Sequence, residues 1–244
     1  MAEWFREWFN TDEYLYVYRS RNEQDAKKLV ELIVKNVNLP ENSKVLDLAC
    51  GAGRHSILFA QKGFKVTAVD LSENLLKVAR HSAKEAKVNI NFVQTDIRHF
   101  CINKKFDLLV SLFTSFGYFD NDKENFMLFD MVQELLNENG SFALDYFNPI
   151  YIRKNLVRKS EEQFNDGKII QERKIVENRV IKRIKIIKDG KEKDFMENVR
   201  MYPLEELKRE IEKRGIMIKH VYGNSDGDSF DAENSKRIVL IAQK

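Results

Sequence analysis

Residues 45–56 read Val45-Leu46-Asp47-Leu48-Ala49-Cys50-Gly51-Ala52-Gly53-Arg54-His55-Ser56. The apolar beginning is typical of a buried strand, and Gly51 and Gly53 follow it one residue apart. Glycine lacks a Cβ and adopts positive φ, so a glycine turn lets the backbone approach a ligand closely. The free N–H groups at the start of a following helix attract negative groups. This stretch therefore predicts a strand, a ligand-binding turn and a helix.

Apolar runs and helical segments alternate on both sides of this turn. The strands are expected at 44–49, 65–69, 91–94, 106–113 and 141–146, and the helices between them at 54–62, 73–86 and 123–137. Strands that alternate with helices form βαβ units, which build a parallel sheet with helices on both faces. Two more strands, at 216–222 and 236–242, are expected to complete the sheet.

Residues 158–201 break this alternation, because they contain no convincing helix. Asp166-Gly167 and Asp189-Gly190 are typical hairpin turns, which predicts an antiparallel β insert. The expected organisation is an N-terminal helical lid (1–40), a ligand-binding core (41–150), the insert (151–201), and a C-terminal helix and β-hairpin that complete the core sheet (202–244).

The composition excludes several classes of protein. The chain has 244 residues, is 43% hydrophobic and carries a net charge of +3. The length predicts one large domain, and the small charge gives no reason to expect a nucleic-acid binder. No apolar run is long enough to span a membrane, and the N-terminus lacks a signal-peptide pattern. Two cysteines form no disulfide framework, so we expect a cytoplasmic protein.

Three kinds of ligand compete for the glycine turn. A nucleoside triphosphate requires Gly-x-x-x-x-Gly-Lys-Ser/Thr, which does not occur. NAD favours Gly-x-Gly-x-x-Gly, but Ser56 takes the place of the third glycine and Ala49 precedes the pair. S-adenosylmethionine has no pyrophosphate and carries an ammonium and a sulfonium group. An acidic residue beside the turn suits it, and Asp47 is there.

The next two strands also end in carboxylates. Asp70 ends the second strand and can accept both ribose hydroxyls of an adenosine. Asp96 ends the third strand, where it can bind the adenine amino group while Ile97 packs on the ring. An ordered set of three acids on one edge of the sheet is hard to explain as helix caps alone.

The chain resembles the class I S-adenosylmethionine-dependent methyltransferases, and among them a bacterial small-molecule branch with an antiparallel β insert. That branch includes sugar N,N-dimethyltransferases and glycine N-methyltransferases. The residues that carry the resemblance are 45–56, 66–72, Asp96-Ile97, 112–119 and 202–207.

The resemblance implies a Rossmann-like, seven-stranded, mostly parallel sheet with an antiparallel last strand and helices on both faces. It places Asp47, Ala49, Gly51 and Gly53 at the methionine end of the donor, Asp70 on the ribose and Asp96-Ile97 on the adenine. The expected donor site is completed by Leu71, Leu112 and the lid residues Tyr18 and Arg21, the last two nearest the methionine carboxylate. Ala49 departs from the family, because many members have a glycine there.

The acceptor site is less visible in the sequence, because methyl transfer can proceed by positioning alone. The fourth and fifth strands end near Tyr118, Tyr146 and Asn148, which are candidates for contact with the acceptor. Tyr118 could also be the catalytic base. The alternative for each is packing at the sheet edge or capping of a loop.

These observations predict an enzyme that transfers a methyl group from S-adenosyl-L-methionine to the N or O of a small molecule, leaving S-adenosyl-L-homocysteine. The insert is expected to be a cap or a homo-oligomer contact. No metal is expected, because the four histidines lack ligand spacing, and a nucleic-acid or membrane partner is not expected either. The alternatives are an NAD(P)-dependent oxidoreductase and a non-catalytic partner or sensor that binds S-adenosylmethionine.

Overall fold

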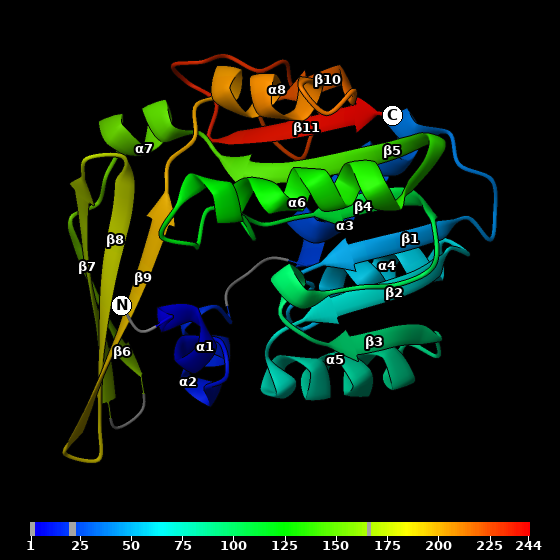
Figure 1. Cartoon of the computed structure of the whole chain (residues 1–244). Helices are drawn as coiled ribbons and strands as arrows, with labels where there is room; N and C mark the ends of the chain where they lie inside the picture. The colour runs from blue at the N-terminus through cyan, green and yellow to red at the C-terminus, as the bar shows by residue number, and fades with distance from the viewer. Residues whose placement is uncertain (1–2, 20–22, 165–166) are drawn as a thin grey trace.

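The computed structural model describes residues 3–19, 23–164 and 167–244. Its main sheet has seven strands in the order β10-β11-β5-β4-β1-β2-β3 (Figure 1). The strands are β1 (Lys44–Leu48), β2 (Lys65–Asp70), β3 (Ile90–Gln94), β4 (Phe106–Ser111), β5 (Leu136–Phe147), β10 (Met217–Tyr222) and β11 (Arg237–Gln243). Strands β1 to β5 pair in parallel, and β11 is antiparallel to both of its neighbours. The predicted mixed sheet with an antiparallel last strand is confirmed.

Helices cover both faces of this sheet. They are α3 (Glu23–Val37), α4 (Arg54–Gln61) and α5 (Glu73–Glu85) on one face, and α6 (Asp122–Leu135) and α8 (Leu204–Glu212) on the other. Side chains alternate along each strand, so Val45 packs toward α3 and α4 while Leu46 and Leu48 pack toward α6. The carboxyl ends of the parallel strands are thereby left open between the two helical layers.

The insert is a second sheet, a four-stranded antiparallel meander in the order β6-β7-β8-β9. Its strands are β6 (Lys159–Phe164), β7 (Gly167–Val176), β8 (Arg179–Lys188) and β9 (Lys191–Arg200). Asp189 and Gly190 have φ of +51° and +70° between the paired residues Lys188 and Lys191, so the second predicted hairpin turn is confirmed. In the first predicted turn, Asp166 lies outside the described residues.

Two short helices, α1 (Trp4–Trp8) and α2 (Asp12–Val17), lie between the insert and the main sheet (Figure 1). Trp8 and Val17 pack against Ile169, Ile184 and Ile186 of the insert in one apolar cluster. The third N-terminal helix, α3, packs instead on the main sheet. Among the described residues of the expected lid (1–40), α1 and α2 lie beside the insert and α3 lies on the main sheet, and the role of a lid stays a prediction.

Two short elements did not appear in the sequence prediction. The helix α7 (Pro149–Lys154) follows β5, and a single 3-10 turn, η1 (Ile97–His99), follows β3. Asn148 begins α7 by accepting the backbone N–H of Ile150 at 3.1 Å. Both elements lie at the carboxyl ends of strands, so they help to shape that edge of the sheet.

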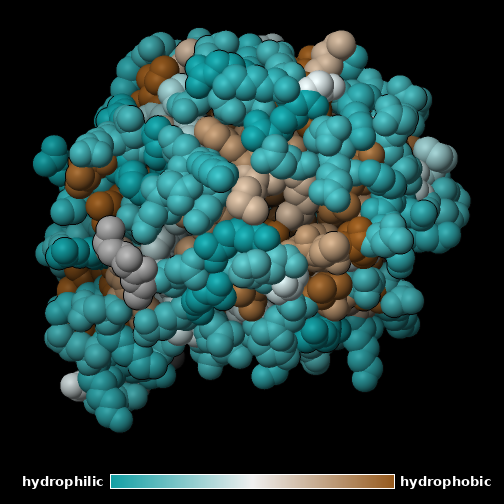
Figure 2. All heavy atoms as spheres, in the orientation of Figure 1, coloured by the Kyte–Doolittle hydropathy of each residue, from teal (hydrophilic) through white to brown (hydrophobic). Residues whose placement is uncertain are grey.

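The surface in the view of Figure 2 is mostly hydrophilic, with a hollowed apolar area near its middle. Over the three described stretches of the chain, no helix is both long enough and apolar enough to cross a membrane.

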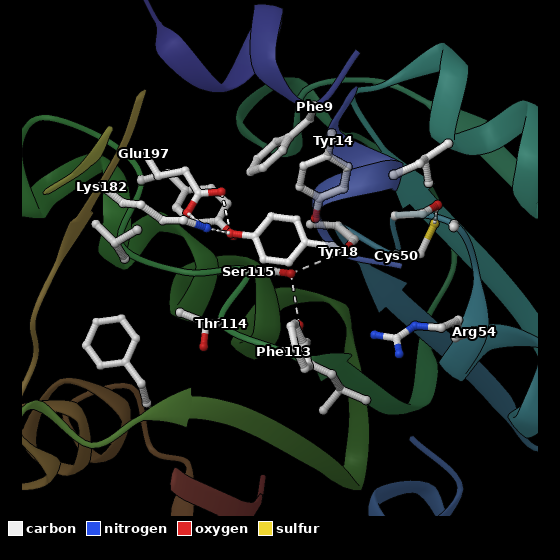
Figure 3. A pocket seen from close by; sticks show the side chains of 18 of the residues that line it. Phe9, Tyr14, Tyr18, Cys50, Arg54, Phe113, Thr114, Ser115, Lys182 and Glu197 are labelled. Carbon is white, nitrogen blue, oxygen red and sulfur yellow. Dashed lines mark hydrogen bonds and ion pairs between the residues drawn. The ribbon is translucent and has the colours of Figure 1, made fainter. Parts of the chain in front are cut away.

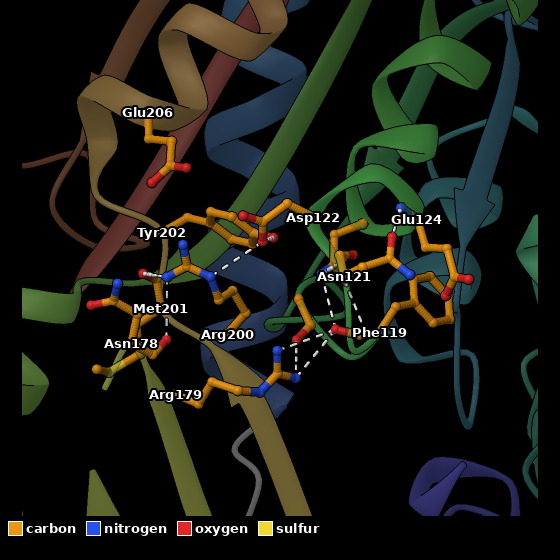
Figure 4. Close-up of polar contacts among 12 residues, drawn as sticks. Phe119, Asn121, Asp122, Glu124, Asn178, Arg179, Arg200, Met201, Tyr202 and Glu206 are labelled. Atoms are coloured by element: carbon orange, nitrogen blue, oxygen red, sulfur yellow. Dashed lines mark hydrogen bonds and ion pairs between the residues drawn. The ribbon is translucent and has the colours of Figure 1, made fainter. Parts of the chain in front are cut away.

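The insert is held against the core by the ends of β8 and β9 (Figure 4). The Arg179 guanidinium donates to the carbonyl of Phe119 at 3.2 Å, and the Arg200 guanidinium to the Asp122 carboxylate at 3.2 Å. The backbone N–H of Arg200 donates to the carbonyl of Gly117 at 2.8 Å. A Cβ on Gly117, which has φ of +89°, would lie 2.9 Å from the Arg200 carbonyl oxygen. This junction therefore requires glycine, and it fixes β8 and β9 beside the end of β4.

Candidate functional site

The glycine turn follows β1 directly and leads into α4. Gly53 caps the start of α4 with φ of +77°, and a Cβ there would lie 2.9 Å from the Cβ of Ala79 in α5. Gly51 also has positive φ, but the nearest atom to its Cβ would be a Leu75 methyl at 4.0 Å. Gly53 is thus required by helix packing, whereas Gly51 leaves open space beside the strand ends.

Ala49 adopts φ of +58°, a left-handed conformation that disfavours residues with a Cβ. It occupies the position where the resemblance leads us to expect a glycine. The residue lines both cavities described below, so its strained backbone lies at the candidate site itself.

Asp47 lies within β1 and is only 2% exposed. The hydroxyl of Ser56 in α4 donates to its carboxylate at 2.5 Å. Burial raises the pKa of Asp47 to about 7; the Ser56 hydrogen bond opposes this rise, and the negative charge of Asp70 adds to it. The first carboxylate of the predicted set is therefore poised between its neutral and ionised forms near neutral pH.

Asp70 ends β2 and is 6% exposed. Its two carboxylate oxygens accept the backbone N–H groups of Gly51 at 2.7 Å and Ser72 at 2.8 Å. Burial raises the pKa of Asp70, and these backbone hydrogen bonds oppose that shift. One carboxylate thus joins the glycine turn after β1 to the start of α5.

Asp96 caps η1 and binds two arginines. Its carboxylate accepts Arg98 Nη2 at 2.6 Å and Arg6 Nη2, from α1, at 2.6 Å. Burial alone would raise the pKa of Asp96, but the hydrogen bonds and charge of Arg98, together with the charge of Arg6, hold it below its usual value. The sequence did not reveal that α1 is joined to the third strand end in this way.

Two adjoining cavities lie at the carboxyl ends of the strands. The smaller, of about 80 Å³, is lined by Asp70, Leu71, Asp96 and Ile97, together with Phe5 and other residues. The larger, of about 510 Å³, is lined by residues of the core, the N-terminal segment and the insert (Figure 3). The larger cavity is lined by six of the predicted site residues, namely Tyr18, Asp47, Ala49, Gly51, Leu112 and Tyr118.

The two cavities meet at the glycine turn. Ala49 and Gly51 line both of them, and so do Phe9, Tyr14 and Tyr118. The structure therefore brings the donor residues predicted from three strands and the turn to one continuous hollow. Gly53 stands behind this hollow, where it packs on α5.

Tyr118 lies at the junction of the cavities, among aromatic rings of α1 and the residue after it. Its ring centroid is 5.3 Å from that of Trp4 and 5.5 Å from that of Phe9. A tyrosine in this position can contact a ligand in either cavity. Its proposed part in acceptor binding or catalysis stays a prediction.

Two other predicted acceptor residues are placed differently. Tyr146 is fully buried, and its hydroxyl donates to the carbonyl of Arg200 in the core behind the site. Burial raises the pKa of Tyr146 far above its ordinary value. Asn148 is 2% exposed and donates to the carbonyls of Ala232 and Ser235, both at 2.8 Å. The structure does not bring either residue into the lining of the two cavities, because their polar groups are used within the fold; their contact with an acceptor stays an untested prediction.

The two predicted lid residues have different outcomes. The Tyr18 hydroxyl donates to Glu197 at 2.5 Å and accepts from Lys182 at 2.7 Å, so it points toward the insert and away from Cys50 in the glycine turn (Figure 3). Arg21, which was expected beside Tyr18, lies outside the described residues.

Lys182 and Glu197 are site residues that the sequence prediction missed. Both line the larger cavity, from neighbouring strands of the insert. A signal was present, because Lys182 shares its face of β8 with Ile184 and Ile186 in a two-residue period. A charged residue on the apolar face of a strand is a candidate functional residue.

Residues 45–140 match the family model described as a methyltransferase domain. A Bacillus subtilis relative, YqeM, whose own assignment as a methyltransferase is provisional, is 36% identical over 109 residues, which is 44% of each chain. The dTDP-3-amino-3,4,6-trideoxy-alpha-D-glucopyranose N,N-dimethyltransferase of Streptomyces venezuelae is 31% identical over 118 residues, or 47% of each chain. The matched regions thus span less than half the length of these curated relatives.

The likeness in fold extends further than the likeness in sequence. An S-adenosylmethionine-dependent methyltransferase from Clostridium acetobutylicum has a TM-score of 0.81 at 21% identity, covering 95% of this chain and 98% of that one. The class I methyltransferase fold therefore extends over nearly the whole chain. The matched residues 45–140 include the glycine turn and the three carboxylates, whereas Tyr18, Lys182 and Glu197 lie outside the matched region.

Proposed function

We propose that this protein transfers a methyl group from S-adenosyl-L-methionine to a small-molecule acceptor. The observation that carries the proposal is the junction of the two cavities at Ala49 and Gly51. A donor that lay across this junction would place its nucleoside on one side of the turn and its methionine on the other. The methyl group would then face the larger cavity, which has room for an acceptor.

The residues at the junction suit this donor. The open space beside Gly51, which a Cβ would begin to fill, lets the donor lie against the backbone. Asp70 would hold the ribose from the edge of the smaller cavity, and Leu71 and Ile97 would enclose the adenine. Asp47, in the larger cavity, would face the ammonium group of the methionine end.

The donor supplies an activated methyl group, so the chain's own residues have to position the acceptor and exclude water. Trp4, Phe9 and Tyr118 form an aromatic wall at the junction. Such a wall excludes water from the place where the methyl group would lie. Tyr118 is also placed to orient the nucleophile of an acceptor from either cavity.

A small acceptor is favoured by the enclosure of the larger cavity. The insert and the N-terminal segment both contribute to its lining, which includes Val199 and Tyr14. Curated relatives that match the chain include the sugar N,N-dimethyltransferase and a ubiquinone biosynthesis O-methyltransferase from Rickettsia canadensis. Both N- and O-methylation are therefore within the proposal.

The decisive experiment is a thermal shift assay with S-adenosylhomocysteine, NADH and NADPH. A ligand at 100 times its dissociation constant stabilises a protein by about 2.7 kcal/mol, or roughly 5–10 °C in Tm at this size. We expect such a shift with S-adenosylhomocysteine alone. A shift with NADH or NADPH alone would support an oxidoreductase and contradict the proposal. Labelled methyl transfer to amines and alcohols then separates an enzyme from a non-catalytic sensor, which would bind the donor without labelling any acceptor.

A further inference from the structure

A polar cluster lies on the insert side of the larger cavity. It consists of Glu197 on β9, Lys182 on β8, Tyr18 after α2 and Trp8 in α1. Glu197 Oε1 accepts the Trp8 indole N–H at 2.8 Å and the Tyr18 hydroxyl at 2.5 Å. Lys182 Nζ lies 3.5 Å from Glu197 Oε2. Three side chains, from α1, β8 and the residue after α2, therefore hold the carboxylate of Glu197 in place.

This carboxylate faces the ligand cavity. Glu197, Lys182 and Tyr18 line the same cavity as Asp47 and Ala49 of the donor side (Figure 3). The side chains of Glu197 and Lys182 are only 14% and 12% exposed. An ion pair with so little contact with solvent is costly unless it is well bonded, so its position beside a cavity is a reason to seek a function.

The hydrogen bonds of Glu197 divide unequally between its oxygens. Oε1 has two partners, whereas the described contact of Oε2 is the ion pair with Lys182. An ionised carboxylate can accept about four hydrogen bonds. Glu197 can therefore accept a further hydrogen bond through Oε2 from a molecule in the cavity.

Aromatic rings line the same cavity. Tyr14 lies 5.0 Å from Tyr18 and 5.0 Å from Phe9, and Trp4 lies 5.5 Å from Phe9, measured between ring centroids. Aromatic faces attract cations, and a fixed carboxylate beside them is complementary to an ammonium group. The cavity is also lined by Arg19, Arg54 and Arg173, so this preference for an amine applies at Glu197 and the aromatic rings and not to the whole cavity.

We infer that Glu197 binds and deprotonates an amine acceptor, which makes it a catalytic residue of the proposed methyltransferase; the inference rests on the proposed function. An amine enters as an ammonium and must lose a proton before its lone pair can attack. The N–H bond breaks and an O–H bond forms on Glu197. The nitrogen lone pair then forms the new N–CH₃ bond as the S–CH₃ bond breaks, and that electron pair stays on sulfur.

The surroundings of Glu197 favour this proton transfer. In a cavity with little contact with solvent, a neutral amine and a neutral carboxyl cost less to desolvate than an ammonium and a carboxylate. Lys182 balances the charge of Glu197 before the amine arrives; because it is a cation it opposes proton uptake by Glu197, and the gain from desolvation has to exceed this effect. Trp8 and Tyr18 hold Oε1, which leaves Oε2 for the acceptor.

The test compares Glu197→Gln with Glu192→Gln. Glu192 is a matched control, because it lies on the same strand and pairs with a lysine of β8, Lys185, at 2.7 Å, but is 53% exposed. The probes are pairs that share a skeleton, benzylamine with benzyl alcohol and glucosamine with glucose. Their binding to protein saturated with S-adenosylhomocysteine is measured by calorimetry, and methyl transfer is measured from labelled S-adenosylmethionine.

We expect the amine of at least one pair to bind and to be methylated in preference to its alcohol. Glu197→Gln should weaken amine binding by about tenfold or more, because a hydrogen bond to a charged group is lost. It should slow methylation by about 100-fold or more, because the proton acceptor is removed. Glu192→Gln should change neither by more than about twofold.

The pH profile distinguishes chemistry from structure. Without Glu197 the reaction depends on free amine from solution, so the rate for Glu197→Gln should rise about tenfold per pH unit below the pKa of the amine. The wild-type rate should depend less steeply on pH over the same range. Glu197→Asp keeps the charge and should recover part of the activity. Equal Tm values for Glu197→Asp and Glu197→Gln would show that their difference in activity does not arise from folding.

Several outcomes would overturn the inference. The inference fails if the alcohols are methylated and the amines are not, or if neither amine binds. It also fails if Glu197→Gln binds the amines as tightly as the wild type and shows the same dependence of rate on pH. Calorimetry with S-adenosylhomocysteine alone separates this failure from that of the proposed function. If S-adenosylhomocysteine binds and the amines do not, only the acceptor assignment fails; if it does not bind, the proposed function fails as well.

Discussion

The carboxylate of Asp70 accepts the backbone N–H of Gly51 at 2.7 Å, so the end of β2 fixes the turn that follows β1. The second oxygen of Asp70 accepts the N–H of Ser72 at the start of α5. Asp70 therefore has a structural part in addition to its proposed contact with the ribose. An informative substitution has to separate these two parts.

Asp70→Asn should weaken S-adenosylhomocysteine binding by about 10–100-fold, because hydrogen bonds to a charged acceptor are lost. It should also lower the free energy of unfolding of the unliganded protein by about 1–3 kcal/mol. Calorimetry measures the first effect and denaturant unfolding the second. The control is Asp107→Asn, because Asp107 accepts the backbone N–H of Lys44 at 2.7 Å at the opposite end of the sheet. Equal loss of affinity in both variants would argue against a ribose contact.

Ala49→Gly should stabilise the protein, although glycine usually destabilises. The left-handed conformation of Ala49 costs about 1–2 kcal/mol, whereas the extra flexibility of an unfolded glycine costs about 0.5–1 kcal/mol. We expect a net gain of about 0.5–1 kcal/mol, or a Tm higher by about 1–4 °C. Calorimetric melting measures this change in Tm. The control is Ala60→Gly in α4, which should lower the free energy of unfolding by about 1 kcal/mol. A lower Tm for Ala49→Gly would contradict the strain argument.

The fold and the donor side of the site could be predicted because their signals are local. A strand, two glycines and a helix start within one stretch of twelve residues, and Asp70 follows from its place at a strand end. The turn at Asp189-Gly190 is equally local, because its two positive φ values suit those two residues. In each case, adjacent residues determine the geometry.

The acceptor side could not be predicted in the same way. Tyr146 ends a strand, but the face to which it points depends on the packing of α6 and the insert around it. Asn148 was considered for the site because α7, whose start it caps, was not foreseen. Glu197 and Trp8 are bonded across a separation of 189 residues, which no local pattern reveals.

The carboxyl of Asp47 should make stability depend on pH. Its pKa is about 7 in the folded protein, against 3.8 as the ordinary value. Because the pKa of Asp47 is higher in the folded protein than in the unfolded chain, the carboxyl group contributes its full stabilisation below pH 4. This stabilisation is lost as the pH rises to 7. Asp47→Asn should therefore gain stability relative to the wild type over this range, by roughly 4 kcal/mol at most. Urea unfolding at pH 4.5, 6 and 7.5 measures this difference.

Two comparisons assign the effect to Asp47. Ser56→Ala removes a hydrogen bond that lowers this pKa, so the decline in stability should extend to higher pH. S-adenosylhomocysteine should bind more tightly as the pH rises through 7, because the ionised carboxylate would face its ammonium group. Asp47→Asn should abolish that pH dependence. A stability difference that does not vary with pH would show that Asp47 is ionised throughout.

The contact between Arg6 and Asp96 should control how firmly α1 holds a bound donor. Arg6 donates to Asp96 at 2.6 Å from beside Phe5, which lines the smaller cavity. Since the Arg6 side chain is 44% exposed, the pair contributes little, about 0.5–1 kcal/mol. Arg6→Gln should therefore weaken S-adenosylhomocysteine binding by only about two- to fivefold, through faster dissociation.

Tryptophan emission can report this dissociation, because both tryptophans of the chain, Trp4 and Trp8, lie in α1. The difference between Arg6→Gln and the wild type should disappear in 1 M salt, which screens exposed charges. Lys193→Gln is the control, because Lys193 pairs with Glu13 of α2 and holds the same segment to the insert without contacting the nucleotide side. If Lys193→Gln speeds dissociation as much as Arg6→Gln, α1 and α2 retain the donor as one unit and Arg6 has no separate part.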